Sequence, residues 1–500
     1  MEIIDNLILG LSVAATPYNL FYCFVGALVG TLIGVLPGLG PLATIAMLLP
    51  LTFGLDPVAA MIMLAGIYYG AQYGGSTTAI LINLPGEASS VITALDGYQL
   101  ARKGKAGLAL ASAAIASFIA GTIATFLIVL FAPPLSAVAL MFGPPEYFSL
   151  MVLGLIGSVA LARGSFVKAL AMIVLGLLLG LVGTDVLTGN LRFTLNFVQL
   201  ADGVNFVIVA MALFGIADII RNLELDHDRS VISSKIKGLM PKWHEIKATI
   251  APSLRGTAVG SVLGILPGGG AVLASFASYT IEKQISSNPE EFGQGATAGV
   301  AGPEAANNAG AQTSFIPMLT LGIPSNPVMA MMVGGLIIQG IQPGPQVMTE
   351  QPELFWGLIA SMWIGNLFLV LLNLPLIQIW VRLLTVPYDI LYPIILVFCT
   401  IGVFTISNAT FDVYLLVVFA MFGYLLLKLE CEPAPLIFGF ILGPMMEENL
   451  RRAMLLSRGD PSVLVTRPIS AVLLAVSALL VILVLLPKFR KTREEAFKED

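Results

Sequence analysis

Polar side chains occur at two places where glycine and proline interrupt apolar stretches of this 500-residue sequence. One block covers residues 34–41 and 74–87, and the other covers residues 264–270 and 302–326. Both supply hydroxyl, carboxamide and backbone carbonyl oxygens, which are hard ligands suited to Na⁺, and helix N-termini whose free N–H groups suit a carboxylate. These residue types favour reversible binding of small ions over bond-making catalysis.

The candidate binding residues lie at and between the glycine and proline positions. In the first block they are Pro37, Gly38, Gly40, Gly74, Gly75, Ser76, Thr77, Thr78, Asn83, Pro85, Gly86 and Glu87. In the second block they are Pro267, Gly268, Gly270, Glu304, Asn307, Asn308, Gln312, Thr313, Ser314, Thr320, Pro324, Ser325 and Asn326. If Glu87 and Glu304 are buried, each is a candidate carrier of a cation or a proton, because a carboxylate at membrane depth is costly and usually functional.

Each feature also has a purely structural interpretation. The glycine-proline stretches could be tight turns or kinks in packed helices. The hydroxyls could bond back to the preceding helical turn, and both glutamates could lie in loop mouths exposed to water. Basic residues are scarce near either block, Arg255 being the nearest to the second. An anionic ligand would therefore depend on helix ends and amides for most of its neutralisation.

Other chemistries are excluded by what the sequence lacks. Cys23, Cys399 and Cys431 have no metal-ligand spacing, and His227 and His244 share one charged loop. No phosphate-binding G-x-x-x-x-G-K-[ST] motif occurs. We therefore expect neither an enzyme nor a bound cofactor or metal, apart from Na⁺ as a candidate coupling ion, and no nucleic-acid partner.

The amino-acid composition indicates whether the protein folds in water or in a membrane. Charged residues are 11% of the sequence, against roughly 25% in soluble globular chains, hydrophobic residues are 57%, and the mean hydropathy is +0.92. So few charges could not coat a soluble protein of 52.8 kDa. The sequence predicts an all-α polytopic protein embedded in membrane lipid, with about 10–12 spans.

Long apolar runs alternate with pieces too short to cross a bilayer. The runs cover residues 20–36, 58–69, 107–132, 147–162, 166–184, 204–220, 354–381, 391–406, 413–427 and 469–486. The short pieces cover residues 42–55, 77–84, 256–266, 271–281, 313–323 and 328–341, each bounded by glycine and proline. A helix can break in lipid only where protein or a water-filled cavity satisfies the freed backbone groups. The breaks therefore predict an internal polar chamber.

The two blocks are copies of each other. Residues 34–40 recur as residues 264–270 at an offset of 230, residues 70–72 recur as 310–312 at 240, and residues 84–85 recur as 323–324 at 239. These matches predict a first transmembrane repeat over residues 1–220, a polar linker over 221–250 and a second repeat over 251–452. A loop, a last helix and a basic tail follow over residues 453–500.

Basic residues indicate that the repeats are inverted. Arg102, Lys103 and Lys105 follow the first block, whereas the equivalent residues 342–353 contain no Lys or Arg. Because Lys and Arg accumulate in cytoplasmic loops, equivalent loops face opposite sides, with the linker and the tail in the cytoplasm. The arginines of residues 451–467 would then lie outside, against this rule.

The motifs together resemble the TctA family, the large membrane subunit of tripartite tricarboxylate transporters. The resemblance rests on residues 30–41, 69–78, 83–87, 96–99, 264–270, 302–308, 320–325 and 447–452, and so spans nearly the whole chain. It implies a multi-pass protein of the bacterial inner membrane that takes up citrate or other carboxylates, driven by a Na⁺ or proton gradient. The implied partners are a small four-span membrane subunit and a periplasmic solute-binding protein.

An elevator-like alternating access of the block region is expected by analogy. An ion or metabolite channel is the alternative, and an intramembrane enzyme and a purely structural subunit are weaker ones. If the blocks bind an anion, replacing Ser76 or Asn326 should raise the apparent Km.

Overall fold

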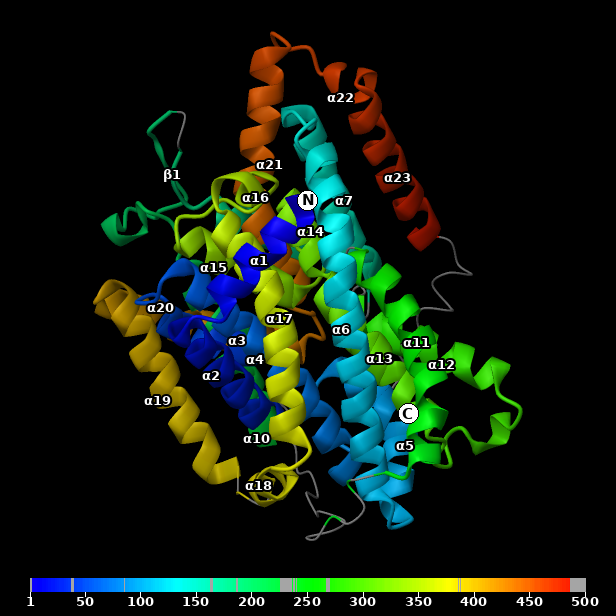
Figure 1. The fold of residues 1–500 in the computed structure, drawn as a ribbon. Coiled ribbons are helices and arrows are strands. Elements are labelled where there is room, and N and C mark those ends of the chain that lie inside the picture. The colour runs from blue at the N-terminus through cyan, green and yellow to red at the C-terminus, as the bar shows by residue number, and fades with distance from the viewer. Residues whose placement is uncertain are drawn as a thin grey trace.

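The computed structural model describes residues 2–36, 40–84, 86–161, 165–185, 188–224, 236, 239, 241–266, 270–384, 386 and 388–485. These residues form helices and one two-stranded sheet (Figure 1). The elements of the first half are α1 (Glu2–Ala14), α2 (Pro17–Gly34), α3 (Pro41–Leu48), η1 (Leu49–Thr52), α4 (Pro57–Ile82), η2 (Ala88–Ser90), α5 (Val91–Arg102), α6 (Ala106–Ala139), α7 (Pro144–Leu161), α8 (Phe166–Gly180), β1 (Gly183–Thr184), β2 (Leu191–Arg192), η3 (Val198–Leu200), α9 (Phe206–Ala210), the π-helical η4 (Met211–Ile216) and α10 (Ala217–Glu224). Those of the second half are α11 (Trp243–Ile265), α12 (Gly270–Ile285), η5 (Pro289–Glu291), α13 (Ala298–Thr313), α14 (Phe315–Leu321), α15 (Pro327–Ile338), α16 (Gln346–Glu350), α17 (Pro352–Asn373), α18 (Ile377–Leu383), α19 (Tyr388–Ser407), α20 (Thr410–Lys428), α21 (Ala434–Leu456), α22 (Val463–Thr466) and α23 (Pro468–Leu485).

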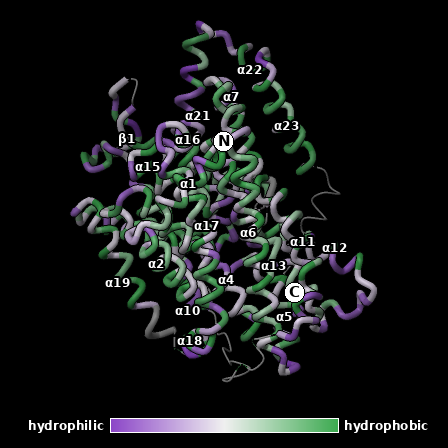
Figure 2. The backbone as a smooth tube through the Cα atoms, viewed as in Figure 1, coloured by the Kyte–Doolittle hydropathy of each residue, from purple (hydrophilic) through white to green (hydrophobic). Residues whose placement is uncertain are grey.

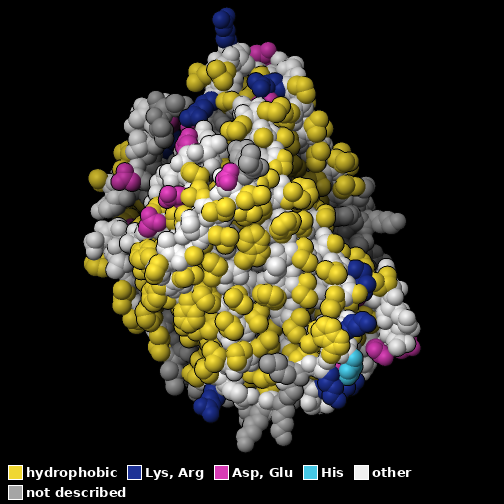
Figure 3. All heavy atoms as spheres, in the orientation of Figure 1, with side chains coloured by type: hydrophobic (Ala, Val, Ile, Leu, Met, Phe, Trp, Pro, Cys, Tyr) yellow, Lys and Arg dark blue, Asp and Glu magenta, His cyan; other side chains and the backbone are white. Residues whose placement is uncertain are grey.

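The all-α polytopic architecture is confirmed. Among the residues that the structure describes, five stretches are long and apolar enough to cross a membrane: α2, α6, the continuous segment Phe206–Glu224, α17 and α20. The same residues include six shorter apolar helices. An apolar surface covers the middle of the visible face, and charged side chains gather toward its upper and lower ends (Figures 2 and 3). This distribution is the one that a bilayer imposes.

Two helix pairs, one in each half of the chain, pack in the same way. Gly26, Gly30 and Gly34 bring α2 so close to α4 that a Cβ on any of them would overlap the backbone at Met63, Ile67 or Ala71, respectively. In the second half, Gly256, Gly260 and Gly264 bring α11 equally close to α13 at Gly302, Ala306 and Gly310, respectively. Small residues every fourth position allow such an approach between membrane helices.

Constant sequence offsets relate the contacts of these two helix pairs. The glycines of α2 match those of α11 at the predicted offset of 230, whereas their partners on α4 match those on α13 at an offset of 239. The offset of 239 also relates Asn83 to Gly322, the left-handed residues that end α4 and α14 at φ 59° and 72°. The sequence alignment of residues 70–72 with 310–312 is therefore shifted by one position.

Two predicted short pieces are wrong. Residues 77–84 and 256–266 belong to unbroken helices, α4 and α11, over most of their length. Gly74 and Gly256 do not interrupt these helices, because both serve as contact surfaces for a neighbouring helix. The helix breaks at residues 83–87 and 322–326 are present in the structure. Helix α2 ends before the interval 35–40 and α3 begins after it, and α11 ends before the interval 266–269 and α12 begins after it.

The rest of each repeat packs against the other. Helix α8 of the first half lies against α21 of the second, and α20 of the second half lies against η4 and α10 of the first. Figure 1 draws α5 toward the lower end of the molecule and α15 in the upper half. The antiparallel strand pair, Gly183 with Arg192 and Thr184 with Leu191, projects at the upper end.

The close contact of α2 with α4 gives a first testable prediction. Replacing Gly30 with Leu should lower the free energy of unfolding by about 3 kcal/mol, because the new side chain must displace the backbone of Ile67. Thermal unfolding of the purified protein in detergent measures the change. Gly54→Ala is the matched control, since nothing lies within 4 Å of a Cβ at that position. Equal melting temperatures for both variants would contradict the proposed packing.

Candidate functional site

The helix interruptions of the two repeats meet inside the protein. A Cβ on Gly40, the N-cap of α3, would lie 3.5 Å from the Gly86 carbonyl oxygen, and one on Gly270 would lie 3.4 Å from the Asn326 side chain. Across the repeats, α12 contacts η2 and α3 contacts α15. The starts of α3, η2, α12 and α15 therefore converge. Pro37, Gly38, Pro85, Pro267 and Gly268 lie outside the described residues.

Equivalent polar residues cap two of these starts. Asn326 begins α15: its Oδ1 accepts the N–H of Met329 at 2.9 Å, and its Nδ2 donates to Ser314 Oγ at 2.9 Å. Glu87, the residue that matches Asn326 in the first repeat, begins η2, and its Oε1 accepts the Ser89 hydroxyl at 2.5 Å. A helix start presents free N–H groups and the positive end of the helix dipole, so these caps flank a region suited to an anion.

A buried carboxylate lies beside this region. Glu304 on α13 is 1% exposed, and Ser76 Oγ of α4 lies 2.8 Å from both of its carboxylate oxygens. Thr93 of α5 also donates to Glu304 Oε1, and Ser117 of α6 lies 3.4 Å from Oε2. Four helices from both repeats thus enclose one carboxylate with three hydroxyl groups. The alternative of a water-exposed loop mouth is wrong for Glu304.

Carboxamides link this carboxylate to the interruptions. One turn beyond Glu304, Asn307 is fully buried; its Nδ2 donates to Glu87 Oε1 at 2.9 Å and its Oδ1 accepts Gln72 Nε2 at 3.0 Å. Asn308 donates to Ser117 Oγ at 2.7 Å. Ser76 Oγ, which bonds to Glu304, also lies 3.1 Å from the carbonyl oxygen of Gln72, so the two predicted carboxylates belong to one polar network.

Arg255 is not available to this network. Its guanidinium donates to both carboxylate oxygens of Glu282, each at 2.7 Å, on the neighbouring helix α12. Such a two-bond pair satisfies the buried Glu282 and uses the positive charge. The positive charge of Arg255, the nearest basic residue in the sequence, is therefore already paired.

Several predicted site residues donate hydrogen bonds to the backbone of their own or a neighbouring helix. Thr77, Thr313 and Thr320 donate to the carbonyl four residues earlier, in agreement with the alternative interpretation of these hydroxyls. Thr78 and Ser314 donate in addition to the carbonyls of Val35 and Gly264, where α2 and α11 end.

The remaining predicted residues shape the interruptions. Gly75 and Gly86 approach each other so closely that a Cβ on Gly86 would overlap the Gly75 Cα, and Gly74 packs against α2. Asn83 ends α4, and Pro324 and Ser325 lie in the turn before α15. Gln312 is occupied with Thr125, whose hydroxyl donates to Gln312 Oε1 at 2.6 Å.

Sequence reasoning missed the hydroxyls that other helices bring to Glu304. Thr93 lies in a helix outside the matched blocks, and Ser117 lies in an alanine-rich apolar run where a serine carries no pattern. Asn366 of α17, which accepts the Tyr73 hydroxyl at 3.0 Å, was missed for the same reason. Only the three-dimensional contacts identify these residues.

Asp96 holds Thr93 in place. It is fully buried, and its Oδ1 accepts three backbone N–H groups of the loop before α13, from Gly293, Gly295 and Ala296, at 2.7–2.8 Å. Its Oδ2 accepts the Tyr279 hydroxyl at 3.0 Å. Because Asp96 lies one turn after Thr93 on α5, this clasp fixes the hydroxyl against α13.

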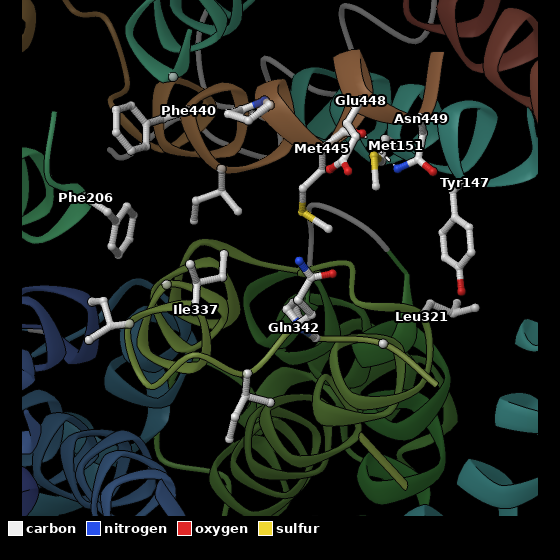
Figure 4. A pocket seen from close by; sticks show the side chains of 18 of the residues that line it. Tyr147, Met151, Phe206, Leu321, Ile337, Gln342, Phe440, Met445, Glu448 and Asn449 are labelled. Carbon is white, nitrogen blue, oxygen red and sulfur yellow. Dashed lines mark hydrogen bonds between the residues drawn. The ribbon is translucent and has the colours of Figure 1, made fainter. Parts of the chain in front are cut away.

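Two cavities accompany the network. A small one of about 10 Å³ has room for about one water-sized sphere and is lined by Ser76, Thr77, Ser117, Glu304 and Asn373, among others. A large open cavity of about 870 Å³ lies between α21 and the segment from α15 to α16 (Figure 4).

Both apolar and polar side chains line the large cavity. Phe206 and Phe440 lie at one end and Tyr147 at the other, with Glu448 and Asn449 on α21 above Gln342 (Figure 4). Leu321, the last residue of α14, is also part of the wall. The cavity therefore reaches from the upper end of the molecule to the break before α15.

Comparison with known proteins gives a family match and curated relatives. The model of the tripartite tricarboxylate transporter TctA family matches residues 20–438. A 52.8 kDa protein of Agrobacterium vitis, named as uncharacterized and encoded in the TAR-I ttuC′ 3′ region, is 60% identical over 500 residues, all of both chains. A second A. vitis protein, from the TAR-II ttuC′ 3′ region and also named as uncharacterized, is 63% identical over 241 residues, 48% of this chain and all of the relative. No solved structure matches.

The Asp96 clasp gives the second prediction. Asp96→Ala should reduce the free energy of unfolding by about 2–3 kcal/mol, since it leaves buried N–H groups without an acceptor. Hydrogen–deuterium exchange should show faster exchange at Gly293, Gly295 and Ala296. Glu290→Ala, an exposed carboxylate in the same loop, is the control. Unchanged protection of these amides in Asp96→Ala would show that the loop is held by other contacts.

Proposed function

This chain belongs to the tripartite tricarboxylate transporter TctA family, and from that premise we propose that it imports tricarboxylates or other small organic carboxylates. It is a multi-pass membrane transporter subunit. In our proposal it acts in the bacterial inner membrane as the large subunit, with a small four-span membrane subunit and a periplasmic solute-binding protein. A Na⁺ or proton gradient drives uptake.

The observation that carries this proposal is the convergence of four helix starts at the repeat interface. Helix N-termini attract carboxylates through unpaired N–H groups and the helix dipole, and broken helices of inverted repeats place such termini near the bilayer midplane. Arg255, the nearest basic residue in the sequence, is bound to Glu282. A carboxylate bound here would be neutralised without a permanent positive charge, which favours its release on the other side.

The large cavity supports alternating access. One wall belongs to α7, α8 and α21, and the other wall belongs to α15 and the loop after it. In our proposal the cavity is the substrate path on the upper side, and an elevator-like movement of the block region transfers the substrate.

A channel is the alternative function, and the interior of the protein disfavours it. A channel requires a continuous pore, whereas Glu304, Asn307 and Gln72 are hydrogen-bonded to other side chains and at most 2% exposed. The space beside Glu304 is only about 10 Å³. Saturable counterflow in liposomes, which a channel does not show, discriminates between the two.

Uptake of labelled citrate tests the function. Cells without their own carriers should accumulate it when this chain is expressed with the small membrane subunit and the binding protein of its system. Accumulation should fall when either partner is omitted and when the driving cation gradient is collapsed. Uptake that needs no gradient, or that only equilibrates citrate, would contradict secondary active transport.

Substitution of the α15 cap tests the site. Asn326→Ala should raise the apparent Km for the carboxylate about tenfold, because an N-cap contributes about 1 kcal/mol or more and 1.4 kcal/mol is a factor of ten. The same uptake assay provides the measurement. Asn288→Ala, an exposed asparagine in the loop before α13, is the control. If Asn326→Ala keeps the original Km, this helix start does not bind the substrate.

A further inference from the structure

Glu304 differs from every other buried acidic side chain among the described residues. Those with less than a tenth of their surface exposed are Asp96, Glu146, Asp185, Glu282 and Glu304. Arginines neutralise three of them: Arg467 pairs with Glu146, Arg451 with Asp185 and Arg255 with Glu282. Asp96 accepts three backbone N–H groups. The described groups that bond to the Glu304 carboxylate are all hydroxyls.

Hydroxyls are an incomplete substitute for a positive charge. No Lys, Arg or His of the described residues forms an ion pair with Glu304, so a negative charge there lacks a counter-charge in a buried site. An unpaired buried charge costs roughly several kcal/mol, even after local relaxation. A hydroxyl, unlike an N–H group, can also rotate its proton away and present a lone pair. The hydroxyl groups around Glu304 can therefore either donate hydrogen bonds to the carboxylate or present their oxygen lone pairs to a cation.

The oxygen atoms form a set that a cation could bind. Ser76, Thr93 and Ser117 supply hydroxyl oxygens from α4, α5 and α6, and Glu304 supplies a carboxylate from α13. The adjacent cavity of about 10 Å³ touches Ser76, Ser117, Glu304 and Asn373. Asn373 is 4% exposed, and its buried Oδ1 has no hydrogen-bond partner among the described residues. This second, independent feature is an unused oxygen in the wall of a space large enough for one small ion.

We propose that this cluster is a Na⁺ site, formed by Glu304, Ser76, Thr93 and Ser117, with Asn373 in the wall of the adjacent small cavity. The proposal rests on the proposed function, for which it supplies the coupling ion. One carboxylate balances a single positive charge, whereas Ca²⁺ favours 6–8 oxygens, commonly with several carboxylates. Binding of a proton requires only one acceptor atom. It would not account for the three hydroxyls around Glu304 or for the unpaired Asn373 oxygen.

The site is connected to the proposed carboxylate site. Glu304 and Asn307 are three residues apart on α13 and so lie on one face. Asn307 donates to Glu87, the cap at the first interruption. Bound Na⁺ neutralises Glu304, which removes repulsion between this carboxylate and an anionic substrate nearby. Occupation of the cation site therefore favours substrate binding, which is the linkage that symport requires.

Direct binding of ²²Na⁺ to the purified full chain tests the proposal without any carboxylate present. We expect saturable binding that unlabelled Na⁺ displaces and that K⁺ or choline does not. Glu304→Gln should abolish it, and Thr93→Val and Ser117→Ala should weaken it about ten- to hundredfold, the range seen when groups that support a bound metal are removed. The increase in melting temperature on addition of Na⁺ should rank the variants in the same order as their Na⁺ binding.

Ser253→Ala is the matched control, because Ser253 is a fully buried hydroxyl that donates to the carbonyl of Thr249 one turn earlier, away from the proposed site. It should bind Na⁺ as the unchanged protein does. If Glu304→Gln does not fold, Thr93→Val and Ser117→Ala decide the outcome. The proposal is overturned if the unchanged protein binds no Na⁺, or if these variants bind it normally. Carboxylate uptake without Na⁺ binding would reject this site and keep the proposed function, whereas Na⁺ binding without uptake would do the reverse.

Discussion

A helix that ends inside a membrane must find partners for its freed N–H and carbonyl groups, and this requirement organises the whole protein. Lipid supplies no hydrogen bonds, so the interruptions must lie in the interior. The close glycine contacts of α2 with α4 and of α11 with α13 leave little room for water or lipid beside the broken ends. Asn326 and Glu87 cap two of the restarting helices. Several helix starts therefore meet in one region, where the positive ends of their dipoles are suited to bind an anion.

Buried carboxylates have different partners in different parts of the molecule. Around Glu146, Asp185 and Glu282, arginines provide a fixed counter-charge and tie helices together. Around Glu304 and Glu87 the partners are hydroxyls and carboxamides, which can donate or accept. A fixed ion pair favours one arrangement, whereas an uncompensated carboxylate makes its surroundings sensitive to the arrival of a cation.

The sequence predicts those features that depend on neighbouring residues. Glycine and proline mark the breaks at residues 83–87 and 322–326 locally, and duplication marks the repeats, so both could be predicted. Gly74 and Gly256 were wrongly predicted to interrupt helices, because the sequence alone does not distinguish a glycine that breaks a helix from one that allows two helices to pack closely. Thr93 and Ser117 could not be predicted, since their significance comes from Glu304, which is far away in the chain. The shifted alignment of residues 70–72 has the same cause: only helix packing fixes the register.

The exchange of helices between the halves affects how the protein is made. Gly176 of α8 and Gly439 of α21 sit against the backbone of the opposite helix, so the two form an intimate pair. About 250 residues separate the end of α8 from the start of α21, which at a ribosomal rate of about 5–20 residues per second is a delay on the order of 10–50 s. Throughout that interval the membrane, or an insertion chaperone, must shield the face of α8 reserved for its late partner. Biogenesis of this protein is thus completed only when its C-terminal part has been synthesised, and a truncated first half would expose an interface that it cannot fill.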